Sequence, residues 1–370
     1  MRCCIVVLGD VGRNPRMQYH ALSLAQNSVC VDFIGYYGTA PHKKLLSHPL
    51  VTFRYLTPAP TLWPGIGLVV KLFWQIFSLF FALICVSRPD FLLVQNPPGL
   101  PALMVCFLVS KIRCFKFLID WHNYTWSIFG LRWGKESFFV KLVKQYEVFF
   151  GQMSDGGLCV TNAMRQDLRF HHINAITFYD RPFDAFRSMG KDDQHRFLVK
   201  IGQSYPQFRD LSVTDRAVVN VSKVAIGRRC LVVTSTSWTP DENFDLLLGA
   251  LRLYNEILVS GEVKRLPNLL VAVTGKGPLK SHYEQVFASL HLECVEIVTL
   301  WLNAEDYPKL LACADLGICL HYSSSGMDLP MKVVDMFGCG LPVLAISYDC
   351  IAELVESTKN GYLFDSAESL

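Results

Sequence analysis

An aspartate and a histidine stand two positions apart in the stretch Asp120-Trp121-His122, directly after an apolar run. A carboxylate and an imidazole can each take a proton from a hydroxyl group near neutral pH. Asp120 and His122 are therefore candidates for a general base, and Asp10, which follows the first apolar run, is a third. A structural alternative stays open, in which Asp120 caps a turn and His122 packs beneath the site.

A loop rich in serine and glycine leads into a predicted helix near Pro330. Lys332 and Asp335 stand three residues apart on that helix, so they share one face. A carboxylate there can accept hydrogen bonds from the two hydroxyls of a ribose, while the helix N-terminus faces a diphosphate. We expect Ser325, Gly326, Lys332 and Asp335 to bind a nucleotide.

A lysine between two glycines, Gly275-Lys276-Gly277, follows another apolar run. The turn is not a P-loop, because the preceding glycine and the Ser or Thr after the lysine are missing. Glycines permit close backbone approach and the lysine supplies a point charge, so we expect Gly275 and Lys276 to contact a diphosphate. Hydrogen bonds to the same group are expected from three hydroxyl residues that end a neighbouring strand, Ser235, Thr236 and Ser237. The alternative is a tight surface turn.

A glycine-containing turn, GDVG, opens a helix after the first predicted strand. The G-x-G-x-x-G fingerprint of dinucleotide-dependent oxidoreductases is absent, which argues against that class. Such a turn still offers backbone N–H groups, here near Gly9 and Gly12, to an anion. Arg13 and Arg16 add positive charge, so we expect a phosphate or acceptor loop at this place.

The elements that must position these groups are short apolar runs alternating with amphipathic stretches. This alternation predicts an α/β fold with parallel sheets, and it occurs twice. We expect two doubly wound, Rossmann-like domains, residues 1–184 and residues 229–370. Residues 185–228 are polar and poorly periodic, so they are expected to be a linker or domain-edge region. Ligands of such sheets bind at the carboxyl ends of the strands, where the groups above are found.

The net charge of the 370 residues is only +3, which excludes a nucleic-acid binder that depends on bulk charge. Residues 1–180 hold 17 Lys and Arg against 9 Asp and Glu, a net of +8, whereas residues 181–370 hold 18 against 23, a net of −5. The basic half is expected to face phosphates or a membrane surface. Thirteen scattered cysteines without a C-x-x-C pair predict reduced thiols in a cytosol-facing protein.

Residues 66–86 are unusually apolar, with Lys71 and Gln75 as the only strongly polar members. The uncharged run after Lys71 has about fifteen residues, fewer than the roughly twenty that span a bilayer. A buried core helix, a helix in the membrane interface and a poor transmembrane span are the alternatives. Aromatic and flanking basic residues favour the interface. The side chains expected to face the membrane are Trp74, Phe77, Phe80 and Phe81.

Several of these stretches together resemble one enzyme family. They include VVLGDVGRNPRMQYHALSLA, QNPPGLPALMV, LIDWHNYTWSIFGL, STSWTPDENF, TGKGPL and the segment from WLNAEDYP to CGLPV. The chain is similar to the chitobiosyldiphosphodolichol β-mannosyltransferases, which have the GT-B fold of two Rossmann-like domains facing a cleft. The resemblance runs from Ile5 to about Phe364, and Asp335 stands where the family has an acidic residue five positions before a G-x-P turn.

The resemblance implies a reaction, substrates and a location. The family transfers the first mannose from GDP-mannose to dolichol-diphosphate-linked chitobiose, with inversion and a β-1,4 linkage, during assembly of the N-glycan precursor. It works at the cytosolic face of the endoplasmic reticulum membrane, in association with other early transferases of the dolichol pathway. Residues 1–184 would then face the acceptor and the membrane, and residues 229–370 would bind the donor.

The resemblance also implies a site that uses neither metal nor cofactor. No D-x-D motif occurs in the sequence, so the leaving diphosphate must be neutralised by cations and helix N-termini. Lys276, Lys332 and Arg13 are the expected cations.

The sequence departs from the family pattern in three places. The family usually has an N-terminal membrane anchor and a closing C-terminal helix, so the C-terminal domain is expected to be incomplete. The earlier of two glutamates common in GT-B enzymes falls near Met327. Two other interpretations therefore stay open: a non-catalytic partner subunit with a degenerate GT-B site, and a GT-B transferase with another donor sugar.

Overall fold

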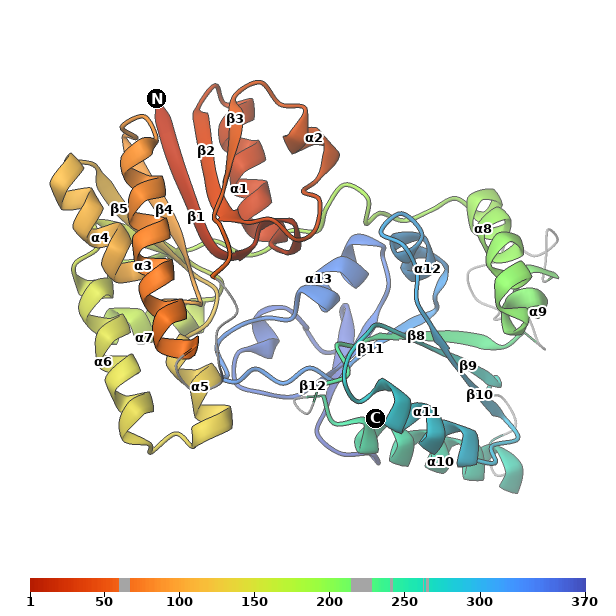
Figure 1. Cartoon of the computed structure of the whole chain (residues 1–370). Helices are drawn as coiled ribbons and strands as arrows, with labels where there is room; N and C mark the ends of the chain where they lie inside the picture. The colour runs from red at the N-terminus through yellow and green to blue at the C-terminus, as the bar shows by residue number, and fades with distance from the viewer. Residues whose placement is uncertain (60–66, 214–227, 240–241, 262, 264–265) are drawn as a thin grey trace. The chain divides into compact units, whose positions relative to one another are not determined.

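The computed structural model describes residues 1–59, 67–213, 228–239, 242–261, 263 and 266–370. Residue 66 of the expected membrane segment and residues 214–227 of the expected linker lie outside this part of the chain. The chain divides into two compact units, Met1–Asp180 (unit 1) and Arg181–Leu370 (unit 2) (Figure 1). Unit 1 thus ends close to the expected boundary at residue 184.

Unit 1 is built on a seven-stranded parallel sheet in the order β3-β2-β1-β4-β5-β6-β7. Its strands are β1 (Arg2–Asp10), β2 (Cys30–Tyr36), β3 (Val51–Tyr55), β4 (Phe91–Asn96), β5 (Lys116–Trp121), β6 (Gly156–Cys159) and β7 (Ile176–Thr177). Its helices are η1 (Val11–Arg13), α1 (Pro15–Gln26), α2 (Lys43–Leu46), α3 (Gly67–Cys85), α4 (Ala102–Arg113), α5 (Thr125–Trp133), α6 (Phe138–Gln152) and α7 (Asn162–Phe170). The strand order reverses between β1 and β4, which is the place where doubly wound sheets bind ligands.

Unit 2 repeats the plan with a six-stranded parallel sheet in the order β10-β9-β8-β11-β12-β13. Its strands are β8 (Cys230–Ser235), β9 (Leu269–Thr274), β10 (Val295–Leu300), β11 (Leu316–Cys319), β12 (Val343–Ile346) and β13 (Gly361–Phe364). Its helices are α8 (Lys191–Ser204), η2 (Pro206–Phe208), α9 (Arg209–Val213), α10 (Phe244–Ser260), α11 (Lys280–Ser289), α12 (Tyr307–Cys313), α13 (Met331–Gly338) and η3 (Ile351–Glu353). The order reverses between β8 and β11. The prediction of two Rossmann-like α/β domains is therefore confirmed.

The central strands of both sheets are apolar because helices cover them on both faces. In β1 the side chains from Cys3 to Leu8 are buried, and every residue of β9 is buried. Each unit has its own core, one around β1 and α1 and the other around β8, β9 and α10. In β1 and β9 the polar side chains stand at the strand ends, at Arg2, Asp10 and Thr274.

Within residues 185–228, the region expected to be a linker or domain edge, residues 191–204 form helix α8, which belongs to unit 2. Asp192 and Asp193 lie in the first turn of α8, where carboxylates stabilise the partial positive charge of a helix N-terminus. Phe197 and Ile201 are buried one turn apart, and α8 packs against α12. The charged run that suggested a linker is thus the solvent-facing start of an amphipathic helix.

Helix α3 carries the apolar segment and has two different faces. Leu79 and Leu83 are buried against unit 1, whereas Phe77 and Phe81 are 58% and 61% exposed. Trp74 is also exposed, and its indole N–H donates to the backbone oxygen of Thr57 at 2.9 Å. The fourth expected membrane-facing residue, Phe80, is half-buried and packs edge-on against Phe81.

The third alternative for residues 66–86, a poor transmembrane span, depends on helix length and hydropathy. Within the described part of the chain, no helix combines the length and the apolar character that crossing a bilayer requires.

Candidate functional site

Asp120 ends β5 and is the centre of a buried polar network in unit 1. Arg16 on α1 donates from Nε to Oδ2 and from Nη2 to Oδ1, both at 2.9 Å. Nε2 of His20 and Nε2 of His122 lie 3.0 and 2.9 Å from the same Oδ2 atom. Asp120 is completely buried, so these partners replace the water that a carboxylate would otherwise bind. Two of the three predicted base candidates, Asp120 and His122, thus lie in direct contact.

The role expected of Arg16 as a cation for a phosphate is wrong. Its side chain is buried, and Nη1 donates to the backbone oxygen of Phe178 at 2.6 Å and to Asp180 Oδ1 at 3.0 Å. Two carboxylates therefore already neutralise the guanidinium, because a buried charge needs a partner.

The surroundings of Asp120 decide its protonation state. Burial alone would raise the pKa of the carboxyl, but His122, His20 and Arg16 together hold that pKa well below its usual range. Asp120 is therefore ionised at neutral pH and is a poor proton acceptor. Its geometry instead orients His122, whose side chain is partly exposed. A neutral imidazole that donates through Nε2 keeps a lone pair on Nδ1, which can take a proton from another group.

The loop that carries His122 is held in place by the end of strand β4 and by helix α6. The backbone N–H of His122 donates to the backbone oxygen of Asn96 at 2.8 Å, and Asn96 Nδ2 donates to the backbone oxygen of Asn123 at 3.2 Å. Glu147 on α6 accepts from the backbone N–H groups of Thr125 and Trp126, at 2.9 and 3.1 Å. These bonds satisfy the open N-terminus of α5. Sequence reasoning missed Glu147, whose sequence position gives no hint of a cap.

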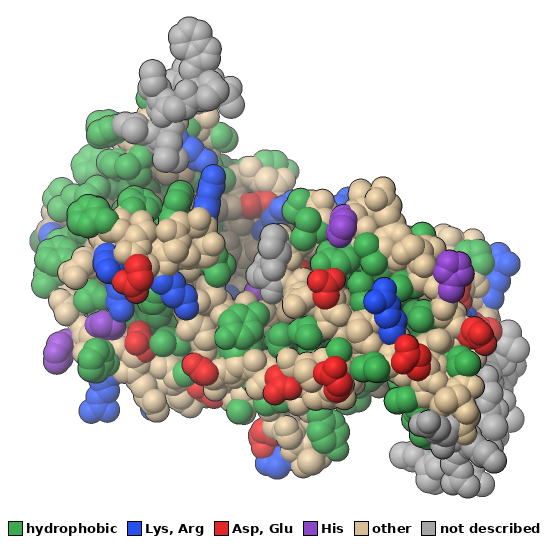
Figure 2. All heavy atoms as spheres, turned by 90° about the horizontal axis from the view of Figure 1, so that it is seen from below, with side chains coloured by type: hydrophobic (Ala, Val, Ile, Leu, Met, Phe, Trp, Pro, Cys, Tyr) green, Lys and Arg blue, Asp and Glu red, His purple; other side chains and the backbone are tan. Residues whose placement is uncertain are grey.

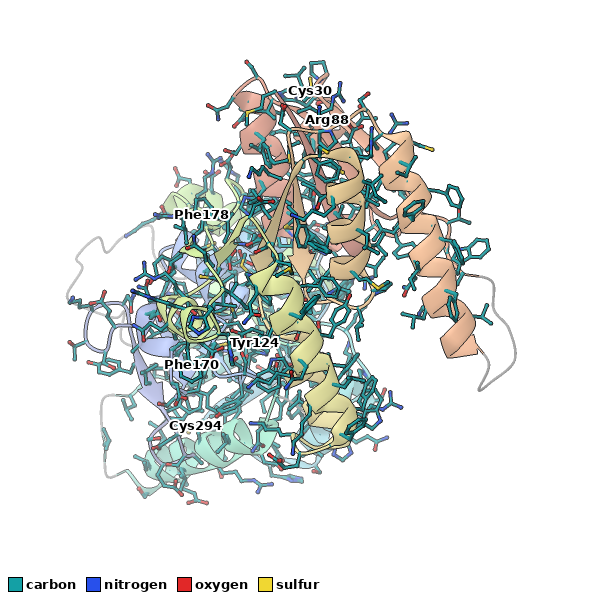
Figure 3. The ribbon with its side chains drawn as sticks, turned by 90° about the vertical axis from the view of Figure 1, so that its left-hand side faces the viewer. Cys30, Arg88, Tyr124, Phe170, Phe178 and Cys294 are labelled. Atoms are coloured by element: carbon teal, nitrogen blue, oxygen red, sulfur yellow. The ribbon has the colours of Figure 1, made fainter. Side chains whose placement is uncertain are left out.

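Figure 3 places this loop within unit 1. Cys30 and Arg88, at the starts of β2 and β4, lie at the top of the view, and Tyr124, just after His122, lies far below them. Phe178, which follows β7, lies between these levels in this view. Its ring is 5.6 Å from His20 and 5.5 Å from the Arg16 guanidinium carbon. Phe178 is 52% exposed, so an apolar surface borders the network.

The third base candidate, Asp10, holds a loop together. Its carboxylate accepts from the backbone N–H of Gly12 at 3.0 Å and from the hydroxyl of Thr39 at 2.8 Å. Burial acts to raise the pKa of Asp10, but the bonds from Thr39 and Gly12 lower it overall. A Cβ atom at Gly12 would fall 2.1 Å from the backbone oxygen of Thr39, so only glycine fits there. No such close contact occurs at Gly9, and the side chain of Arg13 is largely exposed.

Two loops of unit 2 meet at the carboxyl ends of β8 and β9, as expected from the sequence. Cβ atoms at Gly275 and Gly277 would lie only 1.8 and 1.7 Å from the backbone oxygens of Thr236 and Ser237. Both glycines are therefore needed for this close approach. Lys276 between them places Nζ 4.2 Å from the ring centre of Trp301, which follows β10 and is 52% exposed. A lysine and an aromatic ring thus share this edge of the sheet.

Glu242, which sequence reasoning did not select, organises the same edge. It is almost completely buried and accepts from the hydroxyl of Thr236, from the ammonium of Lys332 and, at 2.8 Å, from the backbone N–H of Ser237. Lys332 is therefore held by a carboxylate before any ligand arrives. The hydroxyl of Ser235 lies 2.7 Å from the hydroxyl of Tyr307.

The serine-rich loop before α13 is closed by its own hydroxyl groups. The buried Ser323 hydroxyl accepts from the backbone N–H of Gly326 at 2.9 Å and donates to Asp328. The Ser325 hydroxyl accepts from the backbone N–H of Met327 at 3.2 Å, and Gly326 has a positive φ of 74°. Burial raises the pKa of Asp328. The loop is thus pre-shaped, and side-chain oxygens bind several of its backbone donors.

Asp335 lies one turn after Lys332 on α13 and close to Tyr307. Burial is the main reason why the pKa of Tyr307 is raised, and the Asp335 carboxylate adds to that shift. Ser235 and Tyr307 therefore share a hydrogen bond at the carboxyl end of β8, and the charge of Asp335 acts on the same tyrosine. This end of the unit 2 sheet includes its switch point, between β8 and β11, which is where doubly wound sheets bind ligands.

Across the described residues, no group of three or more His, Cys, Asp and Glu side chains is placed to hold a metal ion. All thirteen cysteines are free thiols, of which eight are buried, three are half-buried, and Cys85 and Cys114 are exposed.

Comparison with known proteins adds the family. The family described as "Glycosyl transferases group 1" matches residues 227–370. A chitobiosyldiphosphodolichol beta-mannosyltransferase of Mus musculus is 45% identical over 99% of this chain and 79% of its own length. The "UDP-glycosyltransferase TURAN" of Arabidopsis thaliana is 42% identical over 100% of this chain and 87% of its own length.

Solved structures agree on the fold. An alpha,alpha-trehalose 6-phosphate synthase from Burkholderia multivorans matches 99% of this chain and 87% of its own with a TM-score of 0.57, at 11% identity. The catalytic domain of starch synthase IV from Arabidopsis thaliana matches 99% and 88% with a TM-score of 0.56, at 12% identity. Likeness at such low identity shows the GT-B fold alone. The identities of the relatives above carry further, and the chain belongs to the chitobiosyldiphosphodolichol beta-mannosyltransferase family.

Proposed function

We propose that the protein transfers mannose from GDP-mannose to chitobiose linked to dolichol diphosphate, forming the β-1,4 linkage of the N-glycan precursor. Family membership supports the reaction, and the observation that carries it in this molecule is the contact between Asp120 and His122. An inverting transfer needs one general base for the acceptor hydroxyl and a stabilised leaving group. We assign the general base to unit 1 and the groups that stabilise the leaving diphosphate to unit 2.

His122 is the proposed base. Nδ1 takes the proton from the 4-hydroxyl of the acceptor sugar as its oxygen bonds to the anomeric carbon of mannose. The bond from that carbon to the diphosphate oxygen breaks on the opposite side, and GDP leaves with the electron pair. Asp120 is a positioning residue, because it holds Nε2 and stabilises the imidazolium that forms. Arg16 and His20 hold Asp120 in turn.

The donor is proposed to bind at the carboxyl edge of the unit 2 sheet. Asp335 accepts the ribose hydroxyls, and the N-terminal backbone of α13, after the Ser325–Gly326 turn, faces the diphosphate. Lys276 and Lys332 neutralise the charge that develops on the leaving group, and neither a metal nor a cofactor takes part. Glu242 fixes Lys332 and the backbone of Ser237, so the cation is positioned before the donor binds.

The proposed setting is the cytosolic face of the endoplasmic reticulum membrane, alongside other early transferases of the dolichol pathway. The acceptor has a long polyprenyl chain that stays in the bilayer. The exposed aromatic side of α3, with Trp74, Phe77 and Phe81, is the proposed membrane contact, and half-buried Phe80 supports it from within.

A second candidate is a transferase with another donor, since the Arabidopsis relative is named a UDP-glycosyltransferase. Thermal unfolding with GDP, UDP or NAD separates these possibilities: a rise in melting temperature with GDP alone supports GDP-mannose. A rise with UDP alone would refute it. A chain that binds GDP but transfers no mannose to a chitobiosyl diphospholipid would instead be a non-catalytic partner subunit.

A further inference from the structure

We propose that the hairpin formed by α5 and α6 is a second contact of unit 1 with an anionic lipid bilayer, separate from α3. The two helices join through residues 134–137, and apolar side chains point outward on both sides of the turn. Phe138, the first residue of α6, is 82% exposed. The other exposed apolar residues at this end of the hairpin are Ile128, Leu131, Trp133, Phe139 and Leu142.

The hairpin does not need these side chains for its own core. On α6, Val140, Val143 and Phe150 face inward and are buried, while Phe138, Leu142 and Phe149 follow one outward stripe. Exposed apolar patches of this kind on a soluble surface mark interaction sites.

A rigid aromatic cluster supports the tip. The ring of Phe129 lies 5.1 Å from that of Trp133 and 5.6 Å from that of Phe139, and the rings of Trp133 and Phe139 are 5.4 Å apart. The last turn of α5 and the first turn of α6 are therefore locked together. Phe138 is presented by a fixed scaffold, so its exposure is not the result of a loose chain end.

The basic residues around the turn between α5 and α6 indicate that the partner of this surface is an anionic lipid bilayer. Arg132, Lys135, Lys141 and Lys144 surround this turn, and Glu136 is the one exposed acidic residue between Ile128 and Lys144. The guanidinium carbon of Arg132 lies 5.3 Å from the Trp133 ring, and Lys144 Nζ lies 4.9 Å from the Trp126 ring. Tryptophan next to basic residues is the composition of membrane interfaces, where rings lie at headgroup depth and cations meet anionic lipids.

The position of the hairpin fits a lipid-linked acceptor. Helix α5 begins at Thr125, three residues after His122, and α3 likewise follows a strand, so both start at the carboxyl edge of the sheet. Helices α3, α4 and α6 pack side by side in unit 1 (Figure 1). Figure 2, the view from below, shows hydrophobic side chains gathered over one side of unit 1, with basic and acidic side chains beside them. Two contacts on this side would hold His122 near the headgroups from which the acceptor sugar projects.

The test is flotation of the 370-residue chain with vesicles of phosphatidylcholine, with and without phosphatidylinositol. In the double variant Phe138→Ser, Leu142→Ser, two apolar side chains no longer move from water into the bilayer. Its partition coefficient into vesicles should therefore fall by about tenfold or more. Phe170→Ser is the matched control, since Phe170 ends α7 in the same unit and is 80% exposed (Figure 3). The control should bind as the wild type does. Equal binding of the double variant and the wild type would overturn the proposal.

A second measurement locates the hairpin directly. Lipids brominated on their acyl chains should quench part of the tryptophan fluorescence, and Trp133→Phe should reduce this quenching, leaving the share that comes from Trp74 on α3. Lys135→Gln should weaken binding to anionic vesicles about fivefold and leave binding to neutral vesicles unchanged. Quenching that Trp133→Phe does not reduce would refute insertion of the tip. Neither measurement uses a substrate, so a chain without transferase activity would refute the proposed function and leave this result standing.

Discussion

Arg16 and Asp120 are joined by two parallel hydrogen bonds of 2.9 Å, although 104 residues separate them in the chain. The pair connects α1 to the end of β5, and both side chains are buried. This geometry fixes the carboxylate in one plane, and His122 takes its orientation from it. The proposed chemistry therefore depends on a contact that exists only in the folded unit.

Asp120→Asn should lower the free energy of unfolding of unit 1 by about 3–5 kcal/mol, because it leaves part of a buried cation uncompensated. Urea unfolding followed by tryptophan fluorescence measures this change. Glu136→Gln is the control, since Glu136 pairs with Lys141 at the surface and should be replaceable without a measurable effect. A loss in Asp120→Asn no larger than that of the control would contradict the central role of the pair.

The same variant gives a pH signature. The pKa of Asp120 is lower in the folded protein than in the unfolded chain, so the carboxylate stabilises the fold above the unfolded value of about 3.9. That contribution is lost as the pH falls through the folded value. The difference in melting temperature between wild type and Asp120→Asn should be constant above about pH 5 and shrink below about pH 4. A difference that grows as the solution becomes more acidic would have the wrong sign.

His122→Ala should lower kcat by about a hundredfold to ten-thousandfold, the usual contribution of a general base, with little change in KM for GDP-mannose. Imidazole in solution should restore part of the activity, which a purely structural role would not allow. His20→Ala is the comparison, because His20 contacts the same oxygen of Asp120. The assignment fails if His20→Ala is the inactive variant and His122→Ala retains full turnover.

Lys276→Ala and Asp335→Ala should each weaken GDP binding about tenfold to a hundredfold, the effect of losing one charge-assisted hydrogen bond. Calorimetry with GDP measures this directly. Lys280→Ala provides a matched control, since Lys280 starts α11 nearby and lies 3.5 Å from Glu284. Unchanged GDP affinity in both site variants would remove the donor from unit 2.

Phe77→Ser with Phe81→Ser should weaken binding of the chain to vesicles by about tenfold or more and leave its melting temperature unchanged, since both rings are mostly exposed. Leu79→Ser should instead destabilise unit 1 by about 2–5 kcal/mol, because Leu79 is fully buried on the other side of α3. Flotation and thermal unfolding of the same samples separate the two effects. Unfolding caused by the two phenylalanine replacements would mean that α3 is an ordinary core helix.

Sequence patterns predicted the parts of the structure that depend on local order. Alternating apolar runs gave both parallel sheets, and the spacing of Asp120 and His122 showed that they share one strand end. Arg16 with Asp120 and Glu242 with Lys332 were not predictable, because each pair joins residues about a hundred positions apart. Composition did not reveal the helix over residues 191–204, since a charged first turn and a linker contain the same residue types.

Helix α3 shows why the alternatives for the apolar segment could not be separated beforehand. A nearly uniform apolar run hides which face is buried, and only the packing of Leu79 and Leu83 distinguishes that face from Phe77 and Phe81. The segment is thus packed against the core on one side and open on the other. Its contact with lipid stays a prediction.

The transfer reaction itself is the most direct measurement. The chain is incubated with GDP-mannose labelled in the sugar and with chitobiosyl diphospholipid in vesicles, and the lipid product is digested with β-mannosidase. We predict a labelled product that carries one added mannose and loses the label to β-mannosidase, with no transfer from UDP-sugars. Absence of transfer from GDP-mannose by a folded chain that binds vesicles, or a product resistant to β-mannosidase, would contradict the proposed function.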